Sequence, residues 1–222
     1  DEGINVHYED NISRIPVRFM DRDNTTIIYT PAVPNDMSEK TFFAKGGFTL
    51  LKRSEILGEL TKGQQALCVA GTHGKTTTTS ILSVLLLNGN LDPTISVGGI
   101  LETIGGNIRV GNSPYFVTEA CEYTNSFLSF FPKISIILNV EEDHMDFFKD
   151  IHHIRSSFHR FAGLIPDDGA LIINQTIDGI FQRVRDIIGT NKFCLVINAN
   201  HHTPLPSTVS FTNNTYVIES FI

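Results

Sequence analysis

Two hydrophobic patterns alternate along most of this chain. Short runs of β-branched and aliphatic residues are typical of strands, and they are followed by longer segments whose apolar residues recur every three or four positions, as on one face of a helix. Alternation of this kind predicts an α/β protein with a mostly parallel sheet. The polar stretch at residues 61–65 is the best candidate linker and divides the chain into residues 1–62 and 63–222.

The part before the linker has three apolar runs that predict strands, at residues 4–8, 25–29 and 48–51. A helix is expected between the second and third, with Ser38 as its N-terminal cap and with Gly46 and Gly47 ending it in a left-handed conformation. Another helix is expected at residues 54–60.

After the linker the alternation is plainer. The expected strands are residues 66–70, 115–118, 134–140, 170–173 and 193–197, and the expected helices are residues 75–88, 151–161 and 177–188. Residues 108–110 and the turn at 111–114 suggest a hairpin with the strand at 115–118. The segment after His201 has weak signals.

Composition narrows the class of protein. Of 222 residues, 41% are hydrophobic and 18% are charged, which fits an ordinary globular protein and argues against disorder or a coiled coil. The net charge is −7 and no basic cluster is present, so we expect no nucleic-acid partner. The longest apolar runs fall well short of the ~20 residues that cross a bilayer, so we expect no membrane insertion.

The cysteines bear on the cellular location of the protein, and the first residues bear on whether the chain is part of a longer one. Cys68, Cys121 and Cys194 are widely spaced and form no CxxC pair, which favours reduced thiols and a cytoplasmic location. Cys121 has no adjacent basic residue to lower its pKa, so we expect a small packed thiol instead of a nucleophile. The chain begins at Asp1 without an initiator Met or a signal segment, and we expect a piece of a longer protein.

The strongest chemical signal lies between the expected strand at 66–70 and the expected helix at 75–88. It is the run Gly71, Thr72, His73, Gly74, Lys75, Thr76, Thr77. Glycines let the backbone approach phosphates, and free N–H groups at a helix start favour an anion. Lys75 can add a charge at the phosphates and the Thr76 hydroxyl can reach Mg²⁺. The general phosphate-loop pattern is only partly met, because Val69 stands at its first glycine, and the alternative is a glycine-rich turn capped by threonines.

Two acidic segments also follow apolar strands. Glu119 and Glu122 come after the strand at 115–118, and His144 lies among the four carboxylates of residues 141–146. A carboxylate at a strand end can hold Mg²⁺, although acidic runs are more often solvated loops. The carboxyl ends of adjacent parallel strands meet at one crevice, so all three segments could share one nucleotide. The residues alone therefore support a nucleotide-binding α/β domain.

Together these motifs resemble the Mur ligases, ATP-dependent amide-forming ligases of peptidoglycan synthesis. The residues that carry the resemblance are the run 71–77, then Glu119, Ala120 and Glu122, then Asn139, Glu141, Asp143, His144 and Asp146. Residues 29–36 and 51–57 are similar to the end of the family's N-terminal domain, so the resemblance runs from about residue 3 to about residue 198. The chain departs from the family at Cys121 and Thr124, where aspartates are usual. These two residues are therefore given no functional role.

The resemblance implies a partial Rossmann-like, UDP-substrate-binding domain over residues 1–62 and a P-loop-type ATPase domain over residues 63–222, both incomplete. The implied reaction uses ATP and Mg²⁺ to join L-alanine to UDP-N-acetylmuramate through an acyl phosphate. Lys75 and His144 are the implied catalytic residues, the run 71–77 binds the nucleotide, and Thr76, Glu119 and His144 bind metal.

Three alternatives remain open. The chain could instead attach recycled murein tripeptide to the same UDP-sugar, although residues 125–128 favour L-alanine. It could be a non-catalytic nucleotide-binding fragment, which would bind Mg·ATP without forming an amide. It could also be a relative of the folylpolyglutamate type, in which Glu119 and His144 would keep their metal roles and the acceptor would differ.

Overall fold

The computed structural model describes residues 4–174, 177, 193–198, 210–212 and 215–219, with side chains for residues 4–174 and 177. Its contacts divide the chain into an N-terminal unit, Asp1–Leu57, and a C-terminal unit, Gly58–Ile222. The division lies within α2 (Arg53–Thr61), just before the polar stretch at residues 61–65. The division into functional domains at residues 62 and 63 stays a prediction.

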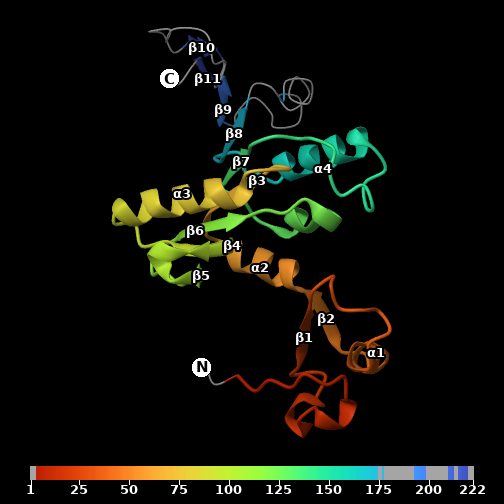
Figure 1. The fold of residues 1–222 in the computed structure, drawn as a ribbon. Coiled ribbons are helices and arrows are strands. Elements are labelled where there is room, and N and C mark those ends of the chain that lie inside the picture. The colour runs from red at the N-terminus through yellow and green to blue at the C-terminus, as the bar shows by residue number, and fades with distance from the viewer. Residues whose placement is uncertain (1–3, 175–176, 178–192, 199–209, 213–214, 220–222) are drawn as a thin grey trace. The chain divides into compact units, whose positions relative to one another are not determined.

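The N-terminal unit is built on two parallel strands, β1 (Thr26–Tyr29) and β2 (Thr49–Lys52), joined by helix α1 (Ser38–Lys45) (Figure 1). Two short 3₁₀ turns precede them, η1 (Ile12–Arg14) and η2 (Val17–Phe19). Both strands and both helices of this part were expected from the sequence, and they are confirmed.

Three expectations for the N-terminal unit are corrected. Residues 4–8 form no strand, and Ile4 and Tyr8 are 74% and 97% exposed, so their alternation marks no buried face. Ser38 is the first residue of α1 and does not cap it. The carboxylate of Asp10 does so instead, accepting the Ser38 and Glu39 N–H groups at 2.7 and 2.9 Å. Of the two glycines, Gly47 alone is left-handed (φ 73°).

The C-terminal unit is organised around a nine-stranded sheet of order β10-β11-β9-β8-β7-β3-β6-β4-β5. Neighbouring strands are parallel except at the two edges, where β4 pairs with β5 and β10 with β11 antiparallel. The expected α/β class is confirmed. The strands are β3 (Gln65–Ala70), β4 (Thr94–Leu101), β5 (Gly106–Arg109), β6 (Tyr115–Glu119), β7 (Ile134–Ile137), β8 (Ala170–Asn174), β9 (Phe193–Asn198), β10 (Ser210–Thr212) and β11 (Thr215–Glu219).

Helix α3 (Lys75–Asn88) packs along β3, β4 and β6, and its bounds match the expected helix (Figure 1). Helix α4 (Ile151–Gly163) is capped by Asp150 and buries the apolar face expected from its sequence. That face meets η4 (Tyr123–Ser129), where Phe127 stacks on Phe161 at 4.7 Å. A further 3₁₀ turn, η3 (Glu102–Ile104), lies between β4 and β5. Among the described residues, none of the helices has the length and apolar composition of a membrane span.

The expected hairpin over residues 108–118 is wrong. β6 pairs in parallel with both β3 and β4, which leaves β5 to fold back on β4 at the edge of the sheet. Left-handed Gly105 (φ 67°) makes that reversal possible. β7 is also shorter than expected, since it ends at Ile137. β4, β10 and β11 were not expected, and the helix expected at 177–188 lies outside the described residues except for Ile177.

Candidate functional site

Three loops meet at one edge of the sheet because β7, β3 and β6 are neighbouring parallel strands. The loop after β3 holds the glycine-rich run, and those after β6 and β7 hold the acidic residues. The Ala120 N–H donates to the Val69 carbonyl (2.8 Å), and the Leu138 N–H donates to the Ala70 carbonyl (3.0 Å). These bonds extend the sheet at the point where the loops begin. The expected convergence of the three segments is therefore present.

The glycine-rich loop needs glycine at both ends. Gly71 and Gly74 have φ values of 143° and 83°. A Cβ on Gly71 would also lie 3.0 Å from the Leu138 Cβ. The first intrahelical bond of α3 runs from the Thr78 N–H to the Gly74 carbonyl. The N–H groups of residues 75–77 precede it and lack an intrahelical partner, so they form a site suited to a phosphate.

The loop after β7 holds the glycine-rich loop in place. The side-chain amide of Asn139 bonds His73 on both sides: Oδ1 accepts the His73 N–H (2.8 Å) and Nδ2 donates to the His73 carbonyl (3.1 Å). The buried Thr72 hydroxyl accepts the Glu141 N–H at 2.9 Å. Sequence reasoning gave Asn139 no separate role. An amide with one donor and one acceptor can satisfy both backbone groups of one residue, and this function has no signature in sequence spacing.

Lys75 lies across its own loop. Its Nζ donates to the carbonyls of Gly71 (2.6 Å) and Thr72 (3.2 Å) and lies 3.0 and 3.2 Å from the two carboxylate oxygens of Glu122. The Glu122 side chain is 2% exposed and that of Lys75 is 15% exposed. The sequence analysis noted Glu122, but of the two glutamates it assigned a metal-binding role to Glu119 alone. A buried carboxylate next to the sheet edge needs a cation, and Lys75 supplies one.

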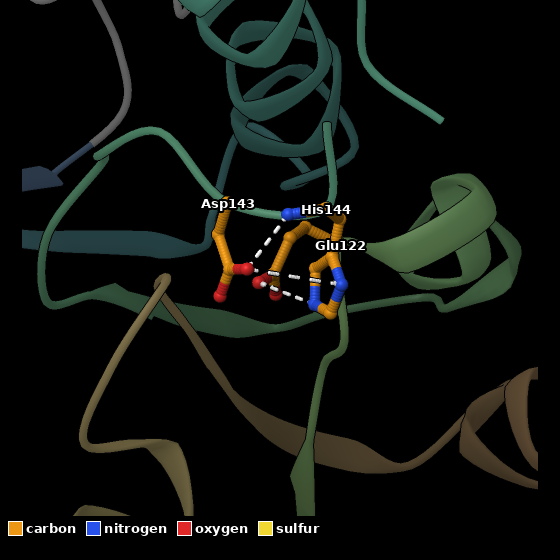
Figure 2. Close-up of side chains that lie close together, drawn as sticks. All are labelled: Glu122, Asp143 and His144. Carbon is orange, nitrogen blue, oxygen red and sulfur yellow. Dashed lines mark hydrogen bonds and ion pairs between the residues drawn. The ribbon is translucent and has the colours of Figure 1, made fainter. Parts of the chain in front are cut away.

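Glu122, Asp143 and His144 form an acidic cluster whose potential ligand atoms all lie within 4.8 Å of one another (Figure 2). The His144 Nε2 is 3.8 Å from Glu122 Oε1, and its Nδ1 is 3.9 Å from Asp143 Oδ1. The His144 backbone is left-handed (φ 52°), and its N–H donates to Asp143 Oδ1 at 2.7 Å. Two carboxylates and one imidazole are a donor set that suits Mg²⁺ or Mn²⁺, and such a cation would offset their negative charge.

Of the three residues expected to bind metal, Thr76 and Glu119 approach β4, whereas His144 lies with Glu122 and Asp143. Glu119 accepts the Gly98 N–H at 2.6 Å, and a Cβ on Gly98 would lie 2.8 Å from its Oε2. A Cβ on Gly99 would lie 3.4 Å from Thr76 Cγ2. Thr76 and Glu119 thus both approach the glycine pair of β4, which sequence reasoning missed. His144 is clustered with Glu122 and Asp143 instead of with Glu119.

The remaining residues of interest lie at the surface. His73, Thr76 and Thr77 are exposed, and the His73 Nε2 is 3.8 Å from Glu141 Oε2. Cys121 is also exposed, so the expectation of a packed thiol is wrong. Desolvation of its thiol still raises the pKa of Cys121, with Glu122 and Glu119 adding to the increase. A thiol that stays protonated is a poor nucleophile, as expected.

Most of the C-terminal unit is similar in sequence to a known protein family. Residues 69–206 match the family model of the Mur ligase middle domain. The UDP-N-acetylmuramate--L-alanine ligase of Lachnospira eligens is 57% identical over 157 residues, which are 70% of this chain and 34% of that protein. The ligase of the same name from Clostridium perfringens is 48% identical over 202 residues, 89% of this chain and 42% of that one. The chain therefore spans between a third and a half of the length of these relatives.

Two solved structures share the fold. The UDP-N-acetylmuramate:L-alanyl-gamma-D-glutamyl-meso-diaminopimelate ligase from Neisseria meningitides has a TM-score of 0.68 at 24% identity, over 85% of this chain and 65% of that one. The UDP-N-acetylmuramate-alanine ligase from Thermotoga maritima has a TM-score of 0.63 at 24% identity, over 80% of this chain and 40% of that one. At 24% identity, each of these structures shows a shared fold and nothing more.

Proposed function

The chain belongs to the Mur ligase family, and from this we propose that it is the ATP-binding part of an enzyme that joins L-alanine to UDP-N-acetylmuramate. The observation that carries the proposal is the free start of α3 beside Lys75 and the acidic cluster of Glu122, Asp143 and His144. The names of the relatives at 48–57% identity support L-alanine as the acceptor. The use of ATP also favours a cytoplasmic location.

The nucleotide phosphates would bind at the start of α3. The free N–H groups of residues 75–77 would donate to a phosphate bound there, and the positive end of the helix dipole would add to the attraction. Lys75 would turn from Glu122 to the β- and γ-phosphates, which are a stronger counter-charge than one carboxylate. Gly71 and Gly74 keep side chains out of the space that the phosphates need.

The residues present fit Mg²⁺ in two places. The acidic cluster offers three donors that already converge, and Thr76 and Glu119 offer a hydroxyl and a carboxylate beside Gly98 and Gly99. Bound Mg²⁺ would neutralise the charge that develops on the transferring phosphoryl group. Glu122 is the residue that links the nucleotide and the cation, since its carboxylate faces both Lys75 and His144.

The proposed reaction has two steps. The lactyl carboxylate of UDP-N-acetylmuramate attacks the γ-phosphorus of ATP, the bond to the β,γ-bridging oxygen breaks, and ADP leaves an acyl phosphate behind. The amine of L-alanine then attacks the acyl carbon, loses a proton and expels inorganic phosphate. Phosphoryl transfer depends on positioning and charge neutralisation, which Lys75 and the loop N–H groups would supply.

The second candidate is ligation of murein tripeptide to the same UDP-sugar. The Neisseria structure bears the name of such a ligase, and at 24% identity it shares the fold of this chain without identifying the acceptor. The relatives at 48–57% identity are named for L-alanine, which is why L-alanine is the proposed acceptor.

The direct test is calorimetric titration of the chain with ATP, with and without Mg²⁺, for the wild type and Lys75→Ala. We expect Mg²⁺-dependent binding that Lys75→Ala weakens by at least tenfold, about 1.4 kcal/mol. Lys62→Ala, which removes an exposed lysine paired with Glu59, is the matched control and should bind as the wild type does. Unchanged binding in Lys75→Ala would contradict the phosphate-loop assignment.

The acceptor is tested by phosphate release. Release that requires both UDP-N-acetylmuramate and L-alanine would support the ligase, and release with murein tripeptide in place of L-alanine would favour the second candidate. ATP binding without release under either condition would indicate a non-catalytic nucleotide-binding fragment.

A further inference from the structure

Tyr123 connects the two loops that carry the acidic cluster. It directly follows Glu122 in the chain, and its ring lies against the His144 imidazole with the centroids 4.5 Å apart and the planes at 31°. Its hydroxyl donates to Asp146 Oδ2 at 2.7 Å. One side chain therefore contacts His144 through its face and Asp146 through its hydroxyl.

The backbone around His144 is fixed independently of Tyr123. The His144 N–H donates to Asp143, and its carbonyl accepts the N–H groups of Phe147 and Phe148, both at 2.9 Å. These bonds hold the main chain but leave the imidazole free to rotate about its side-chain bonds. The ring is 34% exposed, so rotation toward solvent is open to it. The ring has long contacts with Glu122 (3.8 Å) and Asp143 (3.9 Å), and the ring of Tyr123 lies against it and opposes this rotation.

From this geometry we infer that Tyr123 is a positioning residue, which holds the His144 imidazole toward Glu122 so that it can bind a divalent cation. The inference rests on the proposed function, because it assumes the cation site of Glu122, Asp143 and His144. The tilted aromatic contact would favour the ring orientation in which Nε2 faces Glu122 Oε1. Partners that orient a metal-binding histidine without touching the metal commonly control its affinity.

The hydroxyl of Tyr123 anchors its ring to the loop after β7 through Asp146. The hydrogen bond to Asp146, with the charge of that carboxylate, raises the pKa of Tyr123, so the phenol remains a donor. The bond fixes the tilt of the ring that His144 stacks on. It also occupies one carboxylate oxygen of Asp146, a residue that lies outside the acidic cluster.

Three substitutions of Tyr123 separate its effects. Tyr123→Phe keeps the aromatic face, Tyr123→Leu keeps much of the volume without the face, and Tyr123→Ala removes both. His144→Ala defines binding without the imidazole. Tyr8→Ala, at a tyrosine that is 97% exposed in the N-terminal unit, is the control for removing a tyrosine. Far-UV circular dichroism identifies the variants that fold.

The first measurement is nuclear magnetic resonance of the His144 ring without metal. In the wild type, the face of Tyr123 should shift the His144 ring protons upfield, and Tyr123→Phe should retain this shift. Tyr123→Leu and Tyr123→Ala should lose it. A His144 spectrum that is unchanged in Tyr123→Leu would overturn the inference.

The second measurement is binding of Mn²⁺ alone, followed by electron paramagnetic resonance. We expect Tyr123→Leu and Tyr123→Ala to weaken the His144-dependent Mn²⁺ site about tenfold. Tyr123→Phe should recover most of that affinity. Wild-type affinity in both Tyr123→Leu and Tyr123→Ala would overturn the inference, as would a Tyr123→Phe variant that keeps the ring shift but binds no better than Tyr123→Ala.

Failure of the proposed function can be distinguished from failure of the inference about Tyr123. If the wild type binds no Mg·ATP, the phosphate site fails, while the Mn²⁺ comparison still tests Tyr123. If Mn²⁺ binding is insensitive to His144→Ala, the cation site at His144 is wrong and the inference is overturned with it.

Discussion

Lys75 and Glu122 form a buried ion pair in which one ammonium group lies 3.0 and 3.2 Å from both carboxylate oxygens. The same carboxylate is 3.8 Å from the His144 imidazole. A phosphate that draws Lys75 away therefore leaves Glu122 with an unbalanced charge beside two potential metal ligands. Binding of the nucleotide and of a cation should favour each other, because each restores the charge balance that the other disturbs.

Glu122→Gln tests this relationship. The amide keeps the shape of the side chain but removes its charge, so Lys75 loses its buried counter-ion. We expect the free energy of unfolding to fall by about 1–3 kcal/mol, less than the full loss of a buried pair because the amide oxygen still accepts a hydrogen bond. Affinity for Mn²⁺ should fall as well. Urea unfolding and Mn²⁺ titration measure the two effects.

The control for Glu122→Gln is Glu142→Gln, which removes the charge of an exposed glutamate in the loop after β7. It should change the free energy of unfolding by less than about 0.5 kcal/mol. Equal destabilisation in both variants would mean that net charge matters and that the pair with Lys75 does not.

Asn139→Ala should loosen the glycine-rich loop. Asn139 makes both backbone hydrogen bonds of His73, and alanine would leave these groups to water or unpaired. We expect a loss of about 1–2 kcal/mol in the free energy of unfolding and a similar loss in ATP binding, since the loop must be ordered again on binding. Urea unfolding and ATP calorimetry would measure them.

Asn107→Ala, at an exposed residue of β5, is the matched control and should alter neither quantity. If Asn139→Ala loses stability but binds ATP as the wild type does, Asn139 supports the fold and has no influence on the phosphate site.

Much of the fold could be predicted because local signals agreed with the final arrangement. Gly74 and Lys75 mark the start of α3, and the apolar spacing of Ile154 and Phe158 marks the buried face of α4. The convergence of three loops followed from the parallel order of the strands alone. These features depend on neighbours in the sequence or on a general property of parallel sheets.

The parts that could not be predicted depend on contacts distant in sequence. Asp10 caps a helix that begins at Ser38, and Glu122 faces Lys75 across a separation of 47 residues. Sequence position also could not show which of Glu119 and Glu122 lies beside His144, because both residues occur at the end of the same strand. β6 carries Glu119 toward Gly98, whereas the next turn brings Glu122 to His144.

Phe127→Ala should destabilise the C-terminal unit strongly. Phe127 is fully buried, stacks on Phe161 at 4.7 Å and meets the edge of Phe158 at 5.2 Å. Truncation leaves a cavity between η4 and α4, with an expected cost of about 3–5 kcal/mol. Phe131→Ala, at a phenylalanine that is 44% exposed, should cost far less. Thermal unfolding of both variants tests the difference, and equal losses would contradict the packing described for η4.

Acid should weaken the turn between α3 and β4 through Asp92. Its carboxylate accepts bonds from the Arg109 guanidinium and from the backbone and side chain of Asn112. The bond from Arg109, then those from Asn112, lower the pKa of Asp92 from 3.8 to about 2. A lowered pKa in the folded state means that the unfolded chain takes up the proton first. The stabilisation is therefore complete above about pH 4 and is lost as the pH falls toward 2.

Asp92→Asn isolates this contribution. Asparagine tolerates the left-handed backbone of Asp92 (φ 44°) as well as aspartate does, so the substitution removes the charge without adding strain. The variant should be less stable than the wild type at pH 6, and the difference in the free energy of unfolding should shrink steadily between pH 4 and pH 2. Arg109→Gln should reduce the same pH dependence, because it removes the main cause of the lowered pKa. Urea unfolding between pH 2 and pH 6 measures all three proteins, and a difference that stays constant across that range would contradict the role of Asp92.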